Sequence, residues 1–357
     1  MKFGIIGFGF MGKTFVHSIN CLKDFYKDVK KPEIIGVTAS SKKSLKKIDL
    51  ARYGIKHAYD NIESMLQDET IDSVYIASPN NFHLEHIKKC LLSQKNILCD
   101  KPLVSPEDDS SDIHDLINKN KIFQMLFEYR NIPAIREMRE IIKKNKIGKI
   151  INFRLSYLHS GYLDPNRPMS WRLRKGGGAF FDLGPHIIDL TNFLIEDIKL
   201  IHGIKKTHFG KRPIKFNAQK KESVHVDDFA MGICETISGI NGFIEVSRLS
   251  MGSTDDLNIH ISGEKGALKW NLEDLDHFTF STNIGVNKIR CQNSITPLID
   301  FPPSKVSQGW LRAHCHSVYQ FVKQVSNKNL NKSEKECIPN FHDGYKVQKI
   351  LSSFRQI

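Results

Sequence analysis

The run Lys2-Phe-Gly-Ile-Ile-Gly7-Phe-Gly9-Phe-Met-Gly12 decides the fold of the first part of the chain. It predicts a short apolar strand followed by the glycine pattern G-x-G-x-x-G, and after it apolar residues recur at helical spacing. Strand, glycine pattern and helix together are the context of a dinucleotide-binding turn. In such a turn Gly7 allows the tight bend, Gly9 lets the backbone approach a pyrophosphate, and Gly12 permits close packing of helix on strand. We therefore predict that a dinucleotide binds at the start of this helix, with contacts from Gly7, Gly9, Phe10, Met11 and Gly12.

The end of the second predicted strand, residues 33–38, indicates which dinucleotide is bound. A site for NAD would place Asp or Glu there, to bind the ribose 2′-hydroxyl. The chain continues instead with Ala39-Ser40-Ser41-Lys42-Lys43 and has no acid before Asp49. Hydroxyl groups and a lysine suit a 2′-phosphate, so Ser40, Ser41 and Lys42 favour NADP(H), with NAD(H) possible. The alternative is that Lys42 simply begins a solvated helix.

Two further predicted strands, residues 73–78 and 96–99, end in polar residues. In open α/β sheets ligands bind beyond the carboxyl ends of the strands. Ser78, Pro79 and Asn80 lie at the first of these ends, and Lys101-Pro102 follows the second. We expect Lys101 to be a proton donor or a ligand of a substrate hydroxyl. A helix predicted at 107–119 and a sixth strand at 123–127 complete the alternating βα pattern.

Beyond residue 150 the chain becomes rich in strands. Strands are predicted at 150–157, 226–235, 242–250, 258–262, 267–271 and 278–281, and helices at 133–145, 313–326 and 342–355. We predict a Rossmann domain over 1–124 and, over 125–357, an α+β domain with a large open, mainly antiparallel sheet. Such a sheet often pairs its uncovered face with a second subunit, so a homodimer or homotetramer is expected. The basic, polar stretch 205–223 is predicted to be a flexible loop.

The stretch Gly176-Gly-Gly-Ala-Phe-Phe-Asp182-Leu-Gly-Pro-His186 interrupts these strands. Three glycines allow a close approach of backbone, and Pro185 suits the start of a helix. Residues i and i+4 share one helix face, so Asp182 and His186 would project into the same space. His186 is then a candidate general base with a carboxylate beside it. The alternative is that Asp182 is an N-cap and His186 a packed core residue.

Composition excludes several classes of protein. The net charge of +13 is spread over short basic groups without a nucleic-acid-binding module, so we predict no nucleic-acid partner. The seven cysteines are scattered without a C-x-x-C pair, which argues against a disulfide framework or a metal site. No apolar run is long enough to span a membrane, and the N-terminus does not look like a signal peptide. A cytoplasmic enzyme of about two domains fits these properties.

These motifs together resemble the Gfo/Idh/MocA oxidoreductase family, named for glucose–fructose oxidoreductase and inositol 2-dehydrogenase. The resemblance covers nearly the whole chain. It is carried by the fingerprint 7–12, Pro79-Asn80-x-x-His83, Lys101-Pro102 and the glycine–Asp–His motif 176–189, with weaker matches at Arg130, Trp171-Arg172, Val226-Asp-Asp228 and Asp343-Gly344. The family's usual Glu before the lysine is Asp100 here, a change that keeps the charge but shortens the side chain.

The resemblance implies a Rossmann domain followed by an open-faced α/β domain, with the substrate bound between them. It places Lys101, Asp182 and His186 around the reacting carbon, Asn80 and His83 near the nicotinamide ribose, and Arg172 near cofactor or substrate. The implied reaction interconverts a secondary alcohol and a ketone on a sugar, cyclitol or related polyol by hydride transfer. His186 would be the base, Asp182 would orient the polyol or support the imidazolium, and Lys101 would stabilise charge on the reacting oxygen. Arg130 and Tyr157 are further candidates for binding the polyol.

Two alternatives remain at this point. Some relatives retain NAD through a redox cycle that ends in glycoside hydrolysis, and others could be non-catalytic NAD(P)-binding regulators. The first is disfavoured by the missing acid after residue 38, and the second by the presence of Lys101, Asp182 and His186.

Overall fold

The computed structural model describes residues 1–118, 120–291 and 309–357. The chain forms two compact units. The first contains Met1–Asn131 and the described part of Thr296–Tyr345, and the second contains the described part of Ile132–Ile295 together with Lys346–Ile357. The predicted boundary between a cofactor-binding domain (1–124) and a substrate-binding domain (125–357) stays a prediction. The sequence pattern did not indicate that helices from late in the chain complete the first unit.

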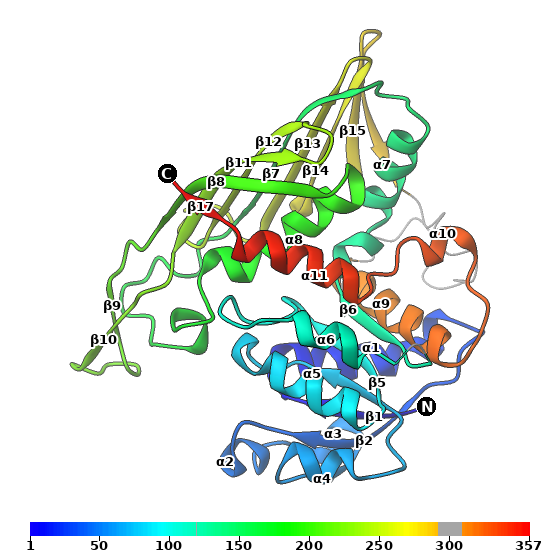
Figure 1. Cartoon of the computed structure of the whole chain (residues 1–357), viewed down its shortest axis with the longest axis vertical. Coiled ribbons are helices and arrows are strands. Elements are labelled where there is room, and N and C mark those ends of the chain that lie inside the picture. The colour runs from blue at the N-terminus through cyan, green and yellow to red at the C-terminus, as the bar shows by residue number, and fades with distance from the viewer. Residues whose placement is uncertain (119, 292–308) are drawn as a thin grey trace. The chain divides into compact units, whose positions relative to one another are not determined.

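The first unit is built on a six-stranded sheet in the order β3-β2-β1-β4-β5-β6, of which β1, β2, β5 and β6 are labelled in Figure 1. All of its paired strands run parallel, which confirms the predicted Rossmann arrangement. The strands are β1 (Lys2–Ile6), β2 (Glu33–Thr38), β3 (Ile55–Ala58), β4 (Ser73–Ile76), β5 (Asn96–Asp100) and β6 (Phe123–Leu126). Helices of this unit are α1 (Phe10–Phe25), α2 (Lys42–Leu45), α3 (Leu50–Tyr53), α4 (Ile62–Leu66), α5 (His83–Leu92), α6 (Ser111–Leu116), α9 (Gly309–Val325) and α10 (Lys332–Lys335), with short 3₁₀ turns at Asn80–Phe82 and Glu128–Asn131.

The order of strands fixes where this unit can bind a ligand. β1 lies between β2 and β4, so the chain leaves β1 toward one edge of the sheet and later returns to build the other. Ligands of doubly wound sheets bind at this switch point, outside the carboxyl ends of the strands. The glycine turn, Ser78 and Lys101 all follow strands at that edge.

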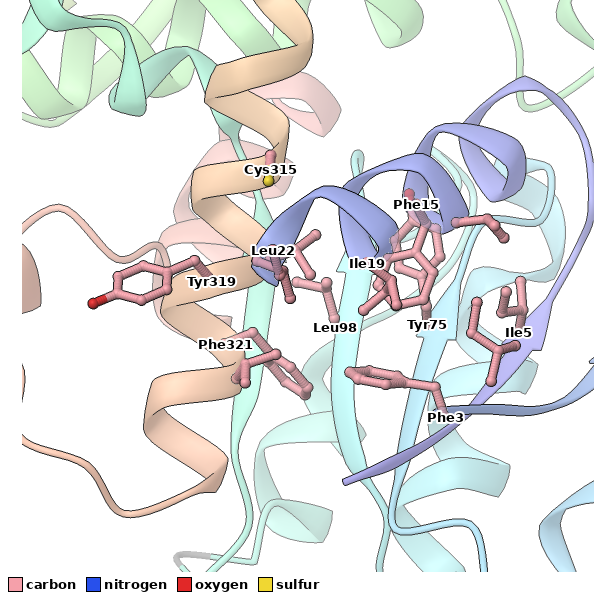
Figure 2. Packing of buried hydrophobic residues seen from close by; sticks show 14 of the residues in the cluster. Phe3, Ile5, Phe15, Ile19, Leu22, Tyr75, Leu98, Cys315, Tyr319 and Phe321 are labelled. Carbon is pink, nitrogen blue, oxygen red and sulfur yellow. The ribbon is translucent and has the colours of Figure 1, made fainter. Parts of the chain in front are cut away.

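The core of the first unit combines aliphatic side chains with a group of packed aromatic rings (Figure 2). Phe15 of α1 lies between Phe3 of β1 and Tyr75 of β4, with ring centroids 5.0 Å and 4.4 Å away. Phe321 of α9 packs against Phe3 at 5.7 Å, and all four side chains are fully buried. Helix α9 is therefore part of the core that supports the glycine turn.

The second unit is built on a nine-stranded sheet in the order β16-β15-β14-β13-β7-β12-β11-β8-β17. Six of its pairings are antiparallel and two are parallel, which confirms the predicted mainly antiparallel sheet. Its strands are β7 (Ile150–Leu158), β8 (Ile198–Lys206), β11 (Phe229–Thr236), β12 (Asn241–Ser247), β13 (Asp256–Gly263), β14 (Gly266–Asn271), β15 (His277–Thr282), β16 (Val286–Arg290) and β17 (Arg355–Gln356).

Helices cover one face of this sheet. Helix α8 (Ala179–Leu194) packs on β7, β8, β11 and β12, while α7 (Pro133–Lys143) packs on β14 and β15. Short 3₁₀ turns lie at Trp171–Leu173 and Leu272–Asp274, and α11 (Phe341–Ser352) is divided between the two units.

Two smaller features differ from the sequence prediction. The stretch 205–223 is not a single flexible loop, because β9 (Lys211–Pro213) and β10 (Lys221–Ser223) pair within it as an antiparallel hairpin. Helix α6 is shorter than the predicted helix at 107–119. Throughout the described ranges, no helix combines the length and the apolar character that crossing a bilayer requires.

Candidate functional site

The glycine turn after β1 has the geometry that its sequence predicts. Gly7 has φ +92°, and a Cβ there would lie 2.7 Å from the carbonyl oxygen of Ala77. A Cβ on Gly12 would lie 2.6 Å from the carbonyl oxygen of Gly7, so only glycine lets α1 approach β1 this closely. A Cβ on Gly9, in contrast, would meet no atom of the described chain within 4 Å.

Gly9 is also the N-cap of α1, and its position gives the turn its binding capacity. With no side chain, Gly9 provides no side-chain cap for the helix. The first backbone N–H groups of an α-helix have no partner within the helix, and at α1 these belong to residues from Phe10 onward. Open space over Gly9, uncapped donors and the positive end of the helix dipole fit a pyrophosphate. The residues present therefore fit a bound dinucleotide.

The residues after β2 have local partners. The Ser41 hydroxyl accepts a hydrogen bond from the backbone N–H of Ser44 and caps α2. Lys42 Nζ lies 3.3 Å from a carboxylate oxygen of Asp60, with both side chains largely exposed. Exposed ion pairs of this kind contribute little energy, so a bound ligand could replace Asp60 as the partner of Lys42 at little energetic cost. A role of Ser40, Ser41 and Lys42 in cofactor choice stays a prediction.

His83 joins the ends of β4 and β5. Its Nδ1 lies 2.8 Å from the carbonyl oxygen of Pro102 and its Nε2 lies 2.9 Å from that of Ser78. The ring is fully buried, so it presents no surface to a cofactor in this structure. His83 therefore links the segments that follow β4 and β5. Its contact with the nicotinamide ribose remains a prediction.

Lys101 follows β5 and is partly exposed. Its backbone N–H donates to Asp100 Oδ1 at 2.9 Å, and Tyr75 Oη donates to Asp100 Oδ2 at 3.4 Å. Asp100 thus fixes the backbone of the lysine despite being shorter than the family's usual glutamate. Burial raises the pKa of Asp100, an effect that the nearby Lys101 and His83 oppose.

Arg130, predicted to bind substrate, is almost fully buried in the first unit. Its Nη2 lies 3.0 Å from Asp343 Oδ1, and its guanidinium lies over the Phe127 ring at 5.9 Å. These contacts attach the loop after β6 to the start of α11. They support a structural role, and substrate binding by Arg130 stays a prediction.

The three glycines before α8 are required by close backbone contacts. Gly176 and Gly178 have φ values of +85° and +100°, which side-chained residues rarely adopt. A Cβ on Gly177 would lie 2.4 Å from the carbonyl oxygen of Arg172, and one on Gly178 would lie 2.4 Å from Asp227 Oδ1. The glycines therefore bring the helix start against the loop of Arg172 and the carboxylate of Asp227.

The N-terminus of α8 shows whether Asp182 is the N-cap, the alternative left open by the sequence. Gly178 is at the N-cap of α8, and the carboxylate of Asp227 accepts the N–H of Phe180 at 2.7 Å. The N-cap interpretation of Asp182 is therefore wrong, because Asp182 lies inside the first turn. Pro185 lies in the second turn of α8, further in than expected, at the cost of one helical hydrogen bond.

Asp182 is held between two arginines. Its Oδ2 accepts from Arg172 Nε at 3.2 Å and from Arg248 Nη2 at 3.0 Å. Arg248 is fully buried and also donates to the carbonyl oxygens of Arg172 and Gly178, at 3.1 Å and 2.6 Å. Two guanidinium groups stabilise the charged carboxylate and fix its direction.

His186 lies one turn beyond Asp182 on α8 and is largely buried. Its ring centroid is 5.6 Å from that of Tyr157 on β7. The structure thus brings the predicted residues Arg172 and Asp182 into contact, and does the same for Tyr157 and His186. Nearby, burial followed by the charge of Arg248 lowers the pKa of His159 to about 4, so this imidazole is neutral at neutral pH.

Sequence reasoning did not assign roles to Arg248 and Asp227. Arg248 is separated from Asp182 by 66 residues and Asp227 from Phe180 by 47. No local spacing signals such contacts. The only sequence signal was the weak family match at Val226-Asp-Asp228.

A parallel six-stranded sheet with a glycine turn that fits a pyrophosphate defines a dinucleotide-binding protein of the Rossmann class. Residues 1–127 match a family model described as an oxidoreductase family with an NAD-binding Rossmann fold. Residues 135–269 match the GFO/IDH/MocA C-terminal domain. The chain belongs to the Gfo/Idh/MocA family of oxidoreductases, which confirms the resemblance drawn from its motifs.

Named relatives act on sugars. Levoglucosan dehydrogenase of Pseudarthrobacter phenanthrenivorans is 28% identical over 291 residues, which cover 77% of this chain and 75% of that protein. Glucose-6-phosphate 3-dehydrogenase of Bacillus subtilis is 22% identical over 358 residues, covering 99% and 95%. A solved structure of levoglucosan dehydrogenase in complex with NADH and levoglucosan has a TM-score of 0.89 and 26% identity, and the match covers 99% of this chain and 95% of that one.

Proposed function

We propose that this protein is an NAD(P)-dependent dehydrogenase that interconverts a secondary alcohol and a ketone on a sugar, cyclitol or related polyol. The observation that carries the proposal is Asp182, aligned by Arg172 and Arg248 on the first turn of α8, with His186 one turn away. A pyrophosphate-compatible turn and a lysine after β5 support it from the first unit. The sugar dehydrogenases among the relatives agree with this chemistry.

Each of the three proposed catalytic residues has a distinct task. A bound nicotinamide would supply the hydride acceptor or donor. Lys101 would donate a hydrogen bond to the reacting oxygen and stabilise its developing negative charge. His186 would take up or return the hydroxyl proton, and the fixed carboxylate of Asp182 would accept hydrogen bonds from polyol hydroxyls. Tyr157 and Arg172 are assigned to substrate and cofactor contacts as part of the same proposal, together with Ser78, Pro79 and Asn80.

The test is a screen of the purified protein against polyols and their keto derivatives, including levoglucosan and inositols, with both NAD⁺ and NADP⁺. Lys101→Met, Asp182→Asn and His186→Gln should each lower kcat, and Lys30→Met, at an exposed lysine before β2, serves as control. If Lys101 and Asp182 serve one reaction, the double variant loses less than the product of the two single losses. Cofactor that stays bound with no net reduction would favour the redox cycle of glycoside hydrolysis. Failure to bind either dinucleotide would favour a non-catalytic role.

The preference for NADP(H) is a separate part of the proposal. It is supported by the absence of an acid after β2 and by the hydroxyls and lysine that stand there. Relatives of known structure bind NADH, so NADH is the competing outcome. Calorimetric titration of the wild type with NADPH and NADH decides between them, and Lys42→Ala should weaken NADPH binding alone if the preference is real.

We also propose a homo-oligomer formed through the open face of the large sheet. The face opposite α8 carries an apolar patch of Ile204, Met231, Ile233 and Phe243, in which Ile204 pairs with Met231 and Ile233 pairs with Phe243. Ile233 and Ile204 are 61% and 38% exposed, and uncovered apolar patches of this kind mark association sites. Ile233→Lys should dissociate the assembly in sedimentation experiments, whereas Ile237→Lys, at an equally exposed site outside the patch, should not.

A further inference from the structure

Glu128 lies just beyond the end of β6, beside the strand that presents Lys101. Strands β5 and β6 run parallel, with Asp100 opposite Leu126. Glu128 follows Leu126 by two residues and begins the 3₁₀ turn after β6, while Lys101 follows Asp100 directly at the end of β5. Topology therefore places Glu128 at the same sheet edge as the proposed catalytic lysine.

The carboxyl group of Glu128 is buried and only partly satisfied. Its side chain belongs to a residue that is 3% exposed, and Oε1 accepts a hydrogen bond from Trp310 Nε1 at 3.1 Å. The other oxygen, Oε2, is buried and has no hydrogen-bond partner within the described part of the chain. A buried carboxylate with an unpartnered oxygen is costly, and protonation of that oxygen removes the cost.

The groups that face Glu128 reinforce this argument. They are Asp100 and Lys101 at the end of β5, Tyr75 on β4 and Trp310 on α9. Burial raises the pKa of Glu128 to about 7 and the charge of Asp100 adds to the rise, while the backbone N–H of Glu128, the charge of Lys101 and the Trp310 hydrogen bond oppose it. Two neighbouring carboxyl groups in a buried place cannot both ionise without a large penalty.

We propose that Glu128 is a positioning residue for Lys101: with Asp100 it forms a buried carboxyl pair that holds one proton and sets the electrostatic environment of the lysine. The pair then carries a single negative charge, which balances the single positive charge of the ammonium group. Ionisation of Glu128 adds a second negative charge near Lys101. That charge opposes the negative charge that develops on the reacting oxygen, so it weakens the stabilisation which the proposed function assigns to Lys101.

The predicted effect of Glu128 on catalysis rests on the proposed function. Its predicted effect on the charge environment of Lys101 does not. The decisive variant is Glu128→Gln, which keeps the shape of the side chain and the acceptor for Trp310 but cannot ionise. Glu69→Gln, at an exposed site of the same unit, is the matched control. Trp310→Phe removes the hydrogen-bond donor to Glu128 and leaves its carboxyl group in place. Comparing this variant with Glu128→Gln separates the effect of local structure from the effect of the charge.

The first experiment needs no substrate. The reactivity of Lys101 toward an amine-directed acylating reagent is followed by mass spectrometry across pH, in the full-length protein. Removal of the Glu128 charge should make Lys101 react several-fold faster above pH 7, because a nearby negative charge favours the unreactive ammonium form, with no change in Glu69→Gln. An unchanged reactivity of Lys101 in Glu128→Gln overturns the proposal, whether or not a substrate is known.

The second experiment uses the enzyme assay. The ratio of kcat/KM of the wild type to that of Glu128→Gln should fall by about tenfold as pH rises through 7, because only the wild type gains a charge. The same ratio against Glu69→Gln should stay flat. A Glu128→Gln enzyme whose profile parallels the wild type contradicts the inference, while absence of any dehydrogenase activity contradicts the proposed function and leaves the labelling result standing.

Discussion

The two units of this protein present their candidate functional groups in different ways. In the first, the glycine turn, Ser78 and Lys101 follow directly from strands whose order is fixed by the alternating βα pattern. In the second, the start of α8 is held by residues distant in sequence: Arg248 contacts Gly178 across 70 residues and Asp227 contacts Phe180 across 47. The backbone topology positions one set of groups, and a buried charge network positions the other.

This difference predicts different consequences of mutation. A functional side chain that protrudes from a strand end can be removed with little effect on the fold. A functional carboxylate whose direction depends on a fully buried arginine cannot be separated from the stability of its unit. The four predictions below test that contrast, from the largest expected effect to the smallest.

Lys101→Met should abolish most of the activity and leave stability unchanged. The lysine is partly exposed and follows the last residue of β5, so its loss creates no buried cavity. We expect kcat to fall by roughly 10²- to 10⁴-fold, with a melting temperature equal to that of the wild type. A large drop in melting temperature would show that the first unit also depends on its functional groups, and would break the contrast.

Arg248→Met should lower both activity and stability. It leaves Asp182 with fewer donors and removes those to the carbonyls of Arg172 and Gly178. Removing one partner of a buried ion pair costs about 3 kcal/mol, measurable by urea denaturation. Arg154→Met, at an exposed position on β7, is the control and should have little effect. An Arg248→Met protein of normal stability but low activity would place the arginine with the substrate rather than with the fold.

Acid should destabilise the first unit more strongly than the second through one buried histidine. Burial lowers the pKa of His314 to about 3, and Ser18 Oγ lies 2.7 Å from its Nδ1. A lowered pKa means that the unfolded chain binds the proton more tightly, so this contribution to stability is complete above pH 6.5 and is lost as pH falls toward 3.

Comparison of two variants measures the effect. Relative to His314→Gln, the wild type should lose about 3 kcal/mol more between pH 7 and pH 4. His159→Gln in the second unit should show a smaller difference, because His159 is only half-buried and its pKa is lowered to about 4. If the wild type loses the same stability relative to each of the two variants, acid does not destabilise the first unit more strongly than the second.

Ser41→Ala should have the smallest effect. Its hydroxyl caps α2, a short helix on the surface, so the loss in stability should stay near 0.5 kcal/mol. If Ser41 also binds a 2′-phosphate, the variant weakens NADPH binding while NADH binding remains. Unchanged affinity for both dinucleotides would leave Ser41 with capping as its one demonstrated task.

What the sequence could predict follows the same division. Gly7, Gly12 and Lys101 lie in local patterns, so the Rossmann sheet and the position of these residues at one edge of it were predictable. The spacing of Asp182 and His186 gave their shared place on α8, and the strand pattern gave a mainly antiparallel sheet. Local patterns report backbone geometry, and these features depend on little else.

The remaining features depend on contacts between distant segments. The cap of α8 by Asp227, the fixing of Asp182 by Arg248 and the hydrogen bond from Trp310 to Glu128 each join residues far apart in the chain. The hairpin of β9 and β10 lies in a polar stretch whose composition suggested a loop. Such pairings are decided by tertiary packing, which a single sequence does not display.

The stacking of Trp310 on Phe10 has an optical consequence. The two rings lie 6.0 Å apart and nearly parallel, and Phe10 begins the helix whose amino end forms the proposed pyrophosphate site. The other tryptophans, Trp171 and Trp270, belong to the second unit. A Trp171→Phe, Trp270→Phe protein would therefore emit from the first unit alone, and quenching of that single emission would time the arrival of a dinucleotide without any substrate or turnover.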